Sequence, residues 1–190
     1  MGALRPAVFL DRDDTLIACN GLPAPMPPAK AGDLVDPALV RLLPGVGAGL
    51  ARLRASGFAL VVVSNQGVVA RGGGTLAQVD AVNARVAALL AAEGAGPAGV
   101  QIERFYYCPF HPKGAVEELS REHPWRKPAP GMIIAAAEEL GLDLGESWLI
   151  GDAPRDVEAG IAAGLRAERC VLLGSAGLED FARCVERVLK

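Results

Sequence analysis

Short apolar runs alternate with longer segments of helical periodicity along the chain, and this alternation limits the fold more than any other feature. The expected strands are residues 7–10, 58–63, 102–107, 147–150 and 170–173. The expected helices are residues 44–56, 76–93, 132–140, 156–163 and 178–189. Strands that alternate with helices form a parallel sheet through right-handed crossovers. We therefore predict a single α/β domain over residues 1–190, with helices flanking a parallel sheet.

The first expected strand, residues 7–10, ends abruptly in Asp11-Arg12-Asp13. Because side chains alternate along a strand, Asp11 and Asp13 should point to one side and Arg12 to the other. In open α/β sheets, ligands bind at the carboxyl edge of the strands. Neighbouring carboxylates there could hold a hard cation such as Mg²⁺, or act as nucleophile and proton carrier. Taken alone, the pattern also suits a solvated acidic turn.

Polar residues also follow the next three expected strands. Ser64 and Asn65 follow the second strand, Lys127 lies in the loop after the third, and Asp152 follows the fourth. Each of these could by itself belong to a turn or a solvated surface. Together they would share one sheet edge, where carboxylates can hold Mg²⁺ and the other groups can hold phosphoryl oxygens. This combination favours phosphoryl transfer.

The same residues resemble the four motifs of the haloacid dehalogenase (HAD) superfamily. Asp11-Arg12-Asp13-Asp14-Thr15 resembles its first motif, Asp-x-Asp-x-Thr. Ser64, Lys127 and Gly151-Asp152 fall on the second, third and fourth motifs. The resemblance implies a three-layer, Rossmann-like (HAD-like) α/β fold. The chain has no large inserted cap domain, so loops would have to shape the pocket, among them residues 19–22, 67–71 and 108–126.

The resemblance also implies a role for each motif residue. Asp11 would be the nucleophile that becomes an aspartyl phosphate, and Asp13 would be the general acid and base. Ser64 and Lys127 would steady the phosphoryl group. Mg²⁺ would be held by Asp11, the backbone carbonyl of Asp13 and Asp152. Asp156 would support the site or cap a helix.

Further stretches resemble the D-glycero-β-D-manno-heptose 1,7-bisphosphate 7-phosphatase family. They are residues 57–63, Asn65-Gln66, Ala70-Arg71-Gly72, residues 106–109 and residues 126–132. The candidate substrate-binding residues are Arg12, Asn65, Gln66, Arg71 and Arg126. In that family the residue matching Arg126 helps to recognise the substrate, and a guanidinium suits a second phosphate. The resemblance implies Mg²⁺-dependent hydrolysis of a sugar phosphate. Histidinol phosphate or another small phosphomonoester is the alternative substrate.

Three features depart from the family. Asp14 stands where glycine is usual, which puts an extra carboxylate near a phosphate site and suggests a catalytically silent phosphosugar-binding protein as a rival. A non-glycine residue also tolerates a positive φ poorly, although Asp tolerates it better than most. Ala153 stands where lysine is common. The segment of residues 19–43 is longer than in the family, which leaves the substrate open.

A zinc site that many family members carry is incomplete here. The matching positions hold Cys108, Phe110, His123 and Trp125. Phe110 and Trp125 cannot bind a metal, and a structural zinc normally takes four protein ligands. His111 could replace one ligand, but we expect no structural zinc and predict that Phe110, Trp125 and the prolines hold this loop by packing.

Composition sets the remaining expectations. A net charge of −3 gives no electrostatic reason to expect binding to nucleic acid or to an anionic membrane. No apolar run is long enough to span a bilayer, and the N-terminus lacks the pattern of a signal peptide. The four cysteines have no paired spacing, so we expect reduced thiols. We predict a cytoplasmic monomer that acts on a small phosphorylated sugar.

Overall fold

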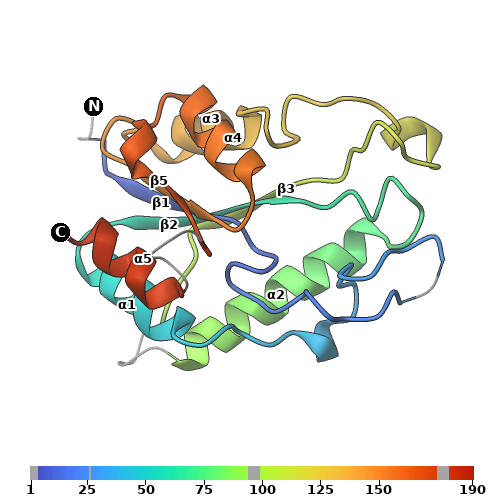
Figure 1. The fold of residues 1–190 in the computed structure, drawn as a ribbon, viewed down its shortest axis with the longest axis horizontal. Helices are drawn as coiled ribbons and strands as arrows, with labels where there is room; N and C mark the ends of the chain where they lie inside the picture. Colours follow the sequence, from blue (N-terminus) through green and yellow to red (C-terminus); the bar gives the residue numbers. More distant parts are fainter. Residues whose placement is uncertain (1–3, 26, 94–98, 175–179) are drawn as a thin grey trace.

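A parallel sheet of five strands forms the centre of the described structure, in the order β3-β2-β1-β4-β5 (Figure 1). The computed structural model describes residues 4–25, 27–93, 99–174 and 180–190. The strands are β1 (Ala7–Leu10), β2 (Ala59–Asn65), β3 (Arg104–Cys108), β4 (Trp148–Gly151) and β5 (Cys170–Leu172). Leu10 lies opposite Val62 of β2 on one side and Ile150 of β4 on the other, so β1 is central.

Helices cover both faces of this sheet. They are α1 (Val46–Ala55), α2 (Leu76–Glu93), α3 (Gly131–Leu140), α4 (Pro154–Ala163) and α5 (Phe181–Val188). Figure 1 shows α3 and α4 on one face, and α1, α2 and α5 on the other. Side chains of β1 alternate between the two cores: Val8 and Leu10 pack with α1, α2 and α5, whereas Phe9 packs with α3 and α4. The predicted three-layer α/β fold is confirmed.

Local sequence signals place several helix ends where they were expected. Helix α2 spans the predicted residues 76–93. Its start is a capping box, in which the Thr75 hydroxyl accepts from the Gln78 N–H and the Gln78 side-chain oxygen accepts from the Thr75 N–H. Gly141 and Gly164 end α3 and α4 with φ angles of 64° and 103°. These left-handed conformations favour glycine, which explains both stops.

Other boundaries differ from the prediction by a few residues. Helix α1 begins at Val46 rather than at residue 44, because Gly45 adopts a left-handed φ of 79°. Helix α4 begins at Pro154, two residues early, because Asp156 occupies its third position and accepts from the Ala153 N–H at 3.0 Å. Helix α5 begins at Phe181, and the earlier residues 178–179 of the prediction lie outside the described residues. The glycines and the proline of residues 94–99 predict a turn, and of these residues the described structure includes only Gly99.

The long segment of residues 19–43 packs against the rest of the molecule. Ala29 and Val35 bury themselves in a small apolar cluster with Val68 and Val79. Residues 37–39 form a 3-10 helix that contacts α2. Asp33 forms an ion pair with Arg71 at 2.6 Å. The segment therefore lies beside the sheet edge at which Asp11 is found.

None of the described helices combines the length and the hydropathy needed to cross a bilayer.

Candidate active site

Asp11 and Asp152 meet at the carboxyl edge of the sheet, between β1 and β4. The strand order changes direction at this point, which is where open α/β sheets bind ligands. The backbone N–H of Asp11 donates to the Ile150 carbonyl at 3.0 Å, which fixes Asp11 beside β4. Carboxylate oxygens of Asp11, Asp152 and Asp156 lie within 4.8 Å of one another. The structure thus brings two predicted metal ligands together and adds Asp156 beside them.

Lys127 is held at the centre of this group. Its ammonium contacts Asp11 Oδ1 at 2.8 Å and Asp156 Oδ1 at 2.7 Å, and donates to the Val63 carbonyl at 2.7 Å. These contacts use all three of its protons. Burial alone lowers the pKa of Lys127, but Asp11 and Asp156 outweigh it and the pKa rises. The lysine therefore stays charged beside the candidate nucleophile.

The carboxyls of Asp11 and Asp152 are costly to ionise together. Burial raises the pKa of Asp11 to about 7, and the nearby carboxylates of Asp156 and Asp13 add to this, while Lys127 opposes it. Burial and Asp156 likewise raise the pKa of Asp152. Oδ1 of Asp152 is buried, and when both carboxyls are ionised it has no hydrogen-bond partner among the described residues. Either a shared proton or a bound cation would relieve this repulsion.

A divalent cation fits the charges of the site. Four carboxylates face two buried cations: Asp11, Asp13, Asp152 and Asp156 against Arg12 and Lys127. Two negative charges are therefore left over, which matches one Mg²⁺. Carboxylate and carbonyl oxygens are also the ligands that Mg²⁺ prefers. Asp11, Asp152 and the carbonyl of Asp13 could supply them.

Several hydrogen-bond donors hold the Asp13 carboxylate in place. Arg12 donates to it twice, from Nε at 2.9 Å and from Nη2 at 3.2 Å. Gln66 donates from Nε2 at 2.8 Å, and the Cys19 thiol donates at 3.3 Å. Burial alone would raise the pKa of Asp13, but Arg12 and Gln66 together lower it. In this geometry Asp13 is an ionised carboxylate in the resting structure.

The residues at the end of β2 connect the site to the loop that carries Lys127. Asn65 accepts from the Lys127 N–H and donates to the Lys127 carbonyl, each at 2.9 Å. This reciprocal pair of hydrogen bonds fixes the position of the Lys127 loop relative to the end of β2. Ser64 is buried, and its hydroxyl accepts from Gln66 Nε2 at 2.8 Å. Ser64 and Asn65 therefore lie at the expected edge, and Asn65 positions Lys127.

A cavity of about 220 Å³ opens directly beside Asp13. Its walls include three arginines, Arg71, Arg126 and Arg155, and the Asp33 carboxylate from the long segment. The loop of residues 67–71 contributes as expected, whereas residues 19–22 are absent from the described lining. Asp33 and Arg155 were not anticipated. The role of Asp33 gives no sequence signal, because Asp33 is 38 residues from its partner Arg71. Arg155 could have been noticed, because it is a positively charged residue that closely follows Gly151-Asp152.

Arg12 does not face this cavity. Its side chain has no solvent exposure, and its guanidinium bonds to Asp13 and, from Nη1 at 2.8 Å, to Asn83 Oδ1 of α2. Arg12 was expected to bind substrate, but in this structure its side chain holds Asp13 in place instead. The physical reason is that its guanidinium is buried, and Asn83 and the Asp13 carboxylate accept hydrogen bonds from its N–H groups.

Asp14 adopts the positive φ that glycine would favour, at 55°. Its Oδ1 accepts from the backbone N–H groups of Cys19 at 2.9 Å and Asn20 at 2.7 Å. Asp tolerates this conformation better than most residues, and two hydrogen bonds offset the strain. The Asp14 carboxylate thus accepts hydrogen bonds from the backbone of the loop that follows.

The loop of residues 108–125 is filled by rings, as predicted. Phe110 and His123 stack with their centroids 4.0 Å apart and planes within 3°. Trp125 packs edge-on against both Tyr106 and His123. His123 Nδ1 accepts from the Trp125 N–H at 3.1 Å. The loop is therefore held by ring packing and by this hydrogen bond.

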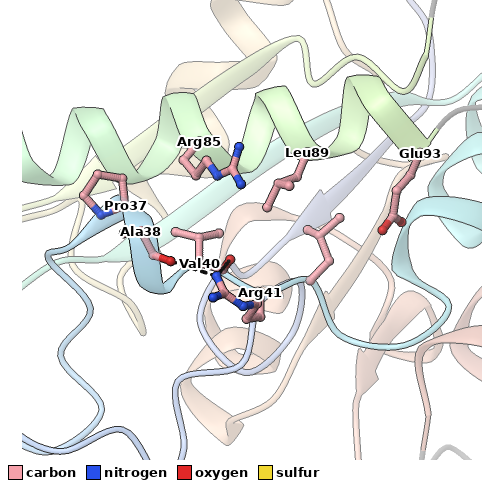
Figure 2. A pocket seen from close by; sticks show the side chains of 8 residues that line it. Pro37, Ala38, Val40, Arg41, Arg85, Leu89 and Glu93 are labelled. Carbon is pink, nitrogen blue, oxygen red and sulfur yellow. Dashed lines mark hydrogen bonds between the residues drawn. The ribbon is translucent and has the colours of Figure 1, made fainter.

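A larger groove, of about 720 Å³, lies elsewhere on the surface. Figure 2 shows it between α2, which contributes Arg85 and Leu89, and the 3-10 helix of residues 37–39. Arg41 turns back on its own segment and donates to the carbonyls of Ala38 and Val40. The groove contains none of the motif residues, so the smaller cavity beside Asp13 is the candidate substrate site.

Comparisons with known proteins show which family this chain resembles. A family model described as HAD-hydrolase-like matches residues 124–183. The D-glycero-beta-D-manno-heptose-1,7-bisphosphate 7-phosphatase of Escherichia coli K12 is 35% identical over 169 residues, which cover 89% of this chain and 80% of the relative. A candidate HAD-like phosphatase structure from Mesorhizobium loti has a TM-score of 0.82 at 31% identity, and covers 99% of this chain and 86% of its own. The structure of D,D-heptose 1,7-bisphosphate phosphatase from B. bronchiseptica, complexed with magnesium and phosphate, has a TM-score of 0.71 at 25% identity and covers 97% of this chain and 98% of its own.

Proposed function

The chain belongs to the HAD phosphatase family that includes the D-glycero-beta-D-manno-heptose-1,7-bisphosphate 7-phosphatases, and from this membership we propose that it removes the 7-phosphate of that heptose bisphosphate. The observation that carries the proposal is the pairing of two features. The Asp11 and Lys127 group suits phosphoryl transfer, and an arginine-lined cavity for a second anion lies directly beside it.

The first half of the proposed reaction uses Asp11 as nucleophile. Lys127 and the Arg12 N–H, at 2.8 Å and 2.7 Å, converge on Asp11 Oδ1 and orient the carboxylate. An Asp11 oxygen attacks phosphorus, and the bond from phosphorus to the sugar oxygen breaks. Asp13 is ionised in the resting structure, so it first takes up a proton from solvent or from the monoprotonated phosphate of the substrate, and then gives that proton to the leaving sugar oxygen. The products of this step are the free sugar hydroxyl and a phosphoryl group on Asp11.

The second half returns the enzyme to its starting state. Asp13, now ionised, takes a proton from a water molecule that attacks the phosphorus of the acyl phosphate. The bond from phosphorus to Asp11 breaks, which releases inorganic phosphate and the Asp11 carboxylate. The donors around Asp13 lower its pKa and keep it ionised once it has lost its proton, so it is in the form that can accept this one. A Mg²⁺ held by Asp11, Asp152 and the Asp13 carbonyl would neutralise charge on the phosphoryl oxygens when bound.

The position of Asp14 supports an active enzyme over a silent binding protein. Its carboxylate oxygen is engaged by the Cys19 and Asn20 N–H groups and is turned to the following loop. Its charge still contributes to raising the pKa of Asp152, after burial and Asp156, but these two hydrogen bonds hold the oxygen toward the loop and support an active site.

Steady-state kinetics with Mg²⁺ would test the proposal. The substrates would be the heptose 1,7-bisphosphate, histidinol phosphate and a small aryl phosphate. We expect kcat/KM for the bisphosphate to exceed the other two by at least a hundredfold, because only it can use both the phosphoryl site and the arginine cavity. A preference for histidinol phosphate would assign the chain to the alternative substrate. Turnover of none of the three would overturn the proposed reaction.

A further inference from the structure

The arginines of the cavity beside Asp13 differ in how they are neutralised. Both carboxylate oxygens of Asp33 accept from Arg71 Nη2, at 2.6 Å and 2.7 Å. Arg126 donates to the Phe110 carbonyl at 3.1 Å, and no described carboxylate lies within ion-pair distance of it. Arg155 likewise has no ion pair with any described residue. Two positive charges of the cavity are therefore available to an anion.

Arg155 lines the same cavity as Asp13 and Arg126. It is the second residue of α4, and it follows Asp152 by three positions. Ala153, where related phosphatases commonly carry a lysine, provides no charge from this turn.

We infer that Arg126 and Arg155 together form a clamp for the second phosphate of a bisphosphate substrate, with Arg155 as an unassigned specificity-determining residue. Two guanidiniums match the two negative charges of a phosphomonoester, and each can donate two parallel hydrogen bonds to its oxygens. Arg155 comes from the first turn of α4 and Arg126 from the loop after β3, so the clamp would set the distance from the second phosphate to Asp11. This inference rests on the proposed function and names the residue that makes the bisphosphate the preferred substrate.

A matched pair of substrates isolates the clamp. D-glycero-D-manno-heptose 1,7-bisphosphate and the corresponding 7-phosphate share the reacting phosphate and differ only at the second one. Phosphate release would be measured with each, for the wild type and for Arg155→Ala, Arg155→Lys, Arg155→Glu and Arg126→Ala. Arg85→Ala is the control, because Arg85 is an exposed arginine on α2 and lines the separate groove of Figure 2. Arg155 is itself exposed, so its variants should fold, and their Tm would be checked.

Arg155→Ala should lower kcat/KM for the bisphosphate by roughly ten- to a hundredfold, mainly through KM, as expected for one lost charge-assisted contact. Its kcat/KM for the 7-phosphate should change less than threefold. Arg155→Lys should retain part of the preference, and Arg155→Glu should lose more than Arg155→Ala. The control should behave like the wild type with both substrates.

The possible failures are distinguishable. A wild type that hydrolyses both substrates equally well would overturn the bisphosphate specificity and the clamp with it. A wild type that prefers the bisphosphate, and keeps that preference in Arg155→Ala while losing it in Arg126→Ala, would overturn the role of Arg155 and leave the proposed function standing. Equal losses on both substrates in Arg155→Ala would mean that Arg155 acts on Asp152 or on the reacting phosphate instead.

Discussion

Nη1 of Arg12 donates to Oδ1 of Asn83 at 2.8 Å, and this bond joins the acidic loop after β1 to helix α2, 71 residues further along the chain. The Arg12 side chain is fully buried, and its remaining contacts hold the Asp13 carboxylate. Helix α2 thereby takes part in positioning the proposed general acid and base, although it contributes no residue to the cavity lining.

We predict that Asn83→Ala destabilises the protein by about 1–3 kcal/mol, because it leaves a buried guanidinium N–H without its acceptor. The same change should lower kcat more than it raises KM, since Asp13 loses part of its support. Urea unfolding and steady-state kinetics would measure the two effects. Asn83→Asp is the matched variant, because it keeps an acceptor at the same place. If Asn83→Ala and Asn83→Asp lost activity equally, the contact with Arg12 would not be the cause.

Asp11→Asn should abolish turnover while the fold is kept, because an amide cannot form the acyl phosphate. Capture of BeF₃⁻, a mimic of the phosphoryl group on Asp11, should disappear in the same variant. Circular dichroism would confirm that the protein is folded. Retention of more than a few per cent of the wild-type rate would rule out the covalent mechanism.

The metal-free protein should lose stability as the pH rises from about 4 to 7, relative to Asp11→Asn. The reason is that burial raises the pKa of Asp11 from 3.8 to about 7. Over that range the folded state keeps a proton that the unfolded state has lost, so the folded state becomes less favoured as pH increases. The Tm of both proteins would be recorded at several pH values in chelator. Parallel curves would show that Asp11 does not titrate in this way. Saturating Mg²⁺ should remove the difference, because a cation stabilises the ionised carboxylate.

Chelation with EDTA should stop turnover, and added Mg²⁺ should restore it. Asp11 and Asp152 provide hard oxygen ligands, and two negative charges of the site need neutralisation. Ca²⁺ should restore far less activity, because it takes more ligands and a looser geometry than Mg²⁺. Full activity in chelator would contradict a role for a metal ion.

The purified protein should contain no stoichiometric zinc. The stacked rings of Phe110 and His123 fill the loop of residues 108–125, and a structural zinc normally takes four protein ligands. Elemental analysis would test this, and chelation should leave the Tm nearly unchanged once Mg²⁺ is returned. One equivalent of tightly held zinc that disappears in Cys108→Ser would show that a site had been rebuilt.

The sequence alone predicted the architecture and the sheet edge at which the candidate site residues meet. Helix α2 was predicted at its observed bounds, because its capping box and its apolar period are local signals. Asp11, Lys127 and Asp152 were expected at one sheet edge, since each follows a recognisable strand and parallel strands end at the same edge. Such local patterns are readable because each depends on residues a few positions apart.

The tertiary structure alone decided what surrounds that centre. Arg12 bonds to Asn83 rather than facing the cavity, and Asp33 neutralises Arg71 across 38 residues. Arg155 lines the same cavity as Arg126, although Arg155 belongs to α4 and Arg126 to the loop after β3. Asp14 is accommodated because its carboxylate meets the N–H groups of the next loop. The partners of a long charged side chain depend on which distant segments fold against it, so local sequence patterns do not predict these partners.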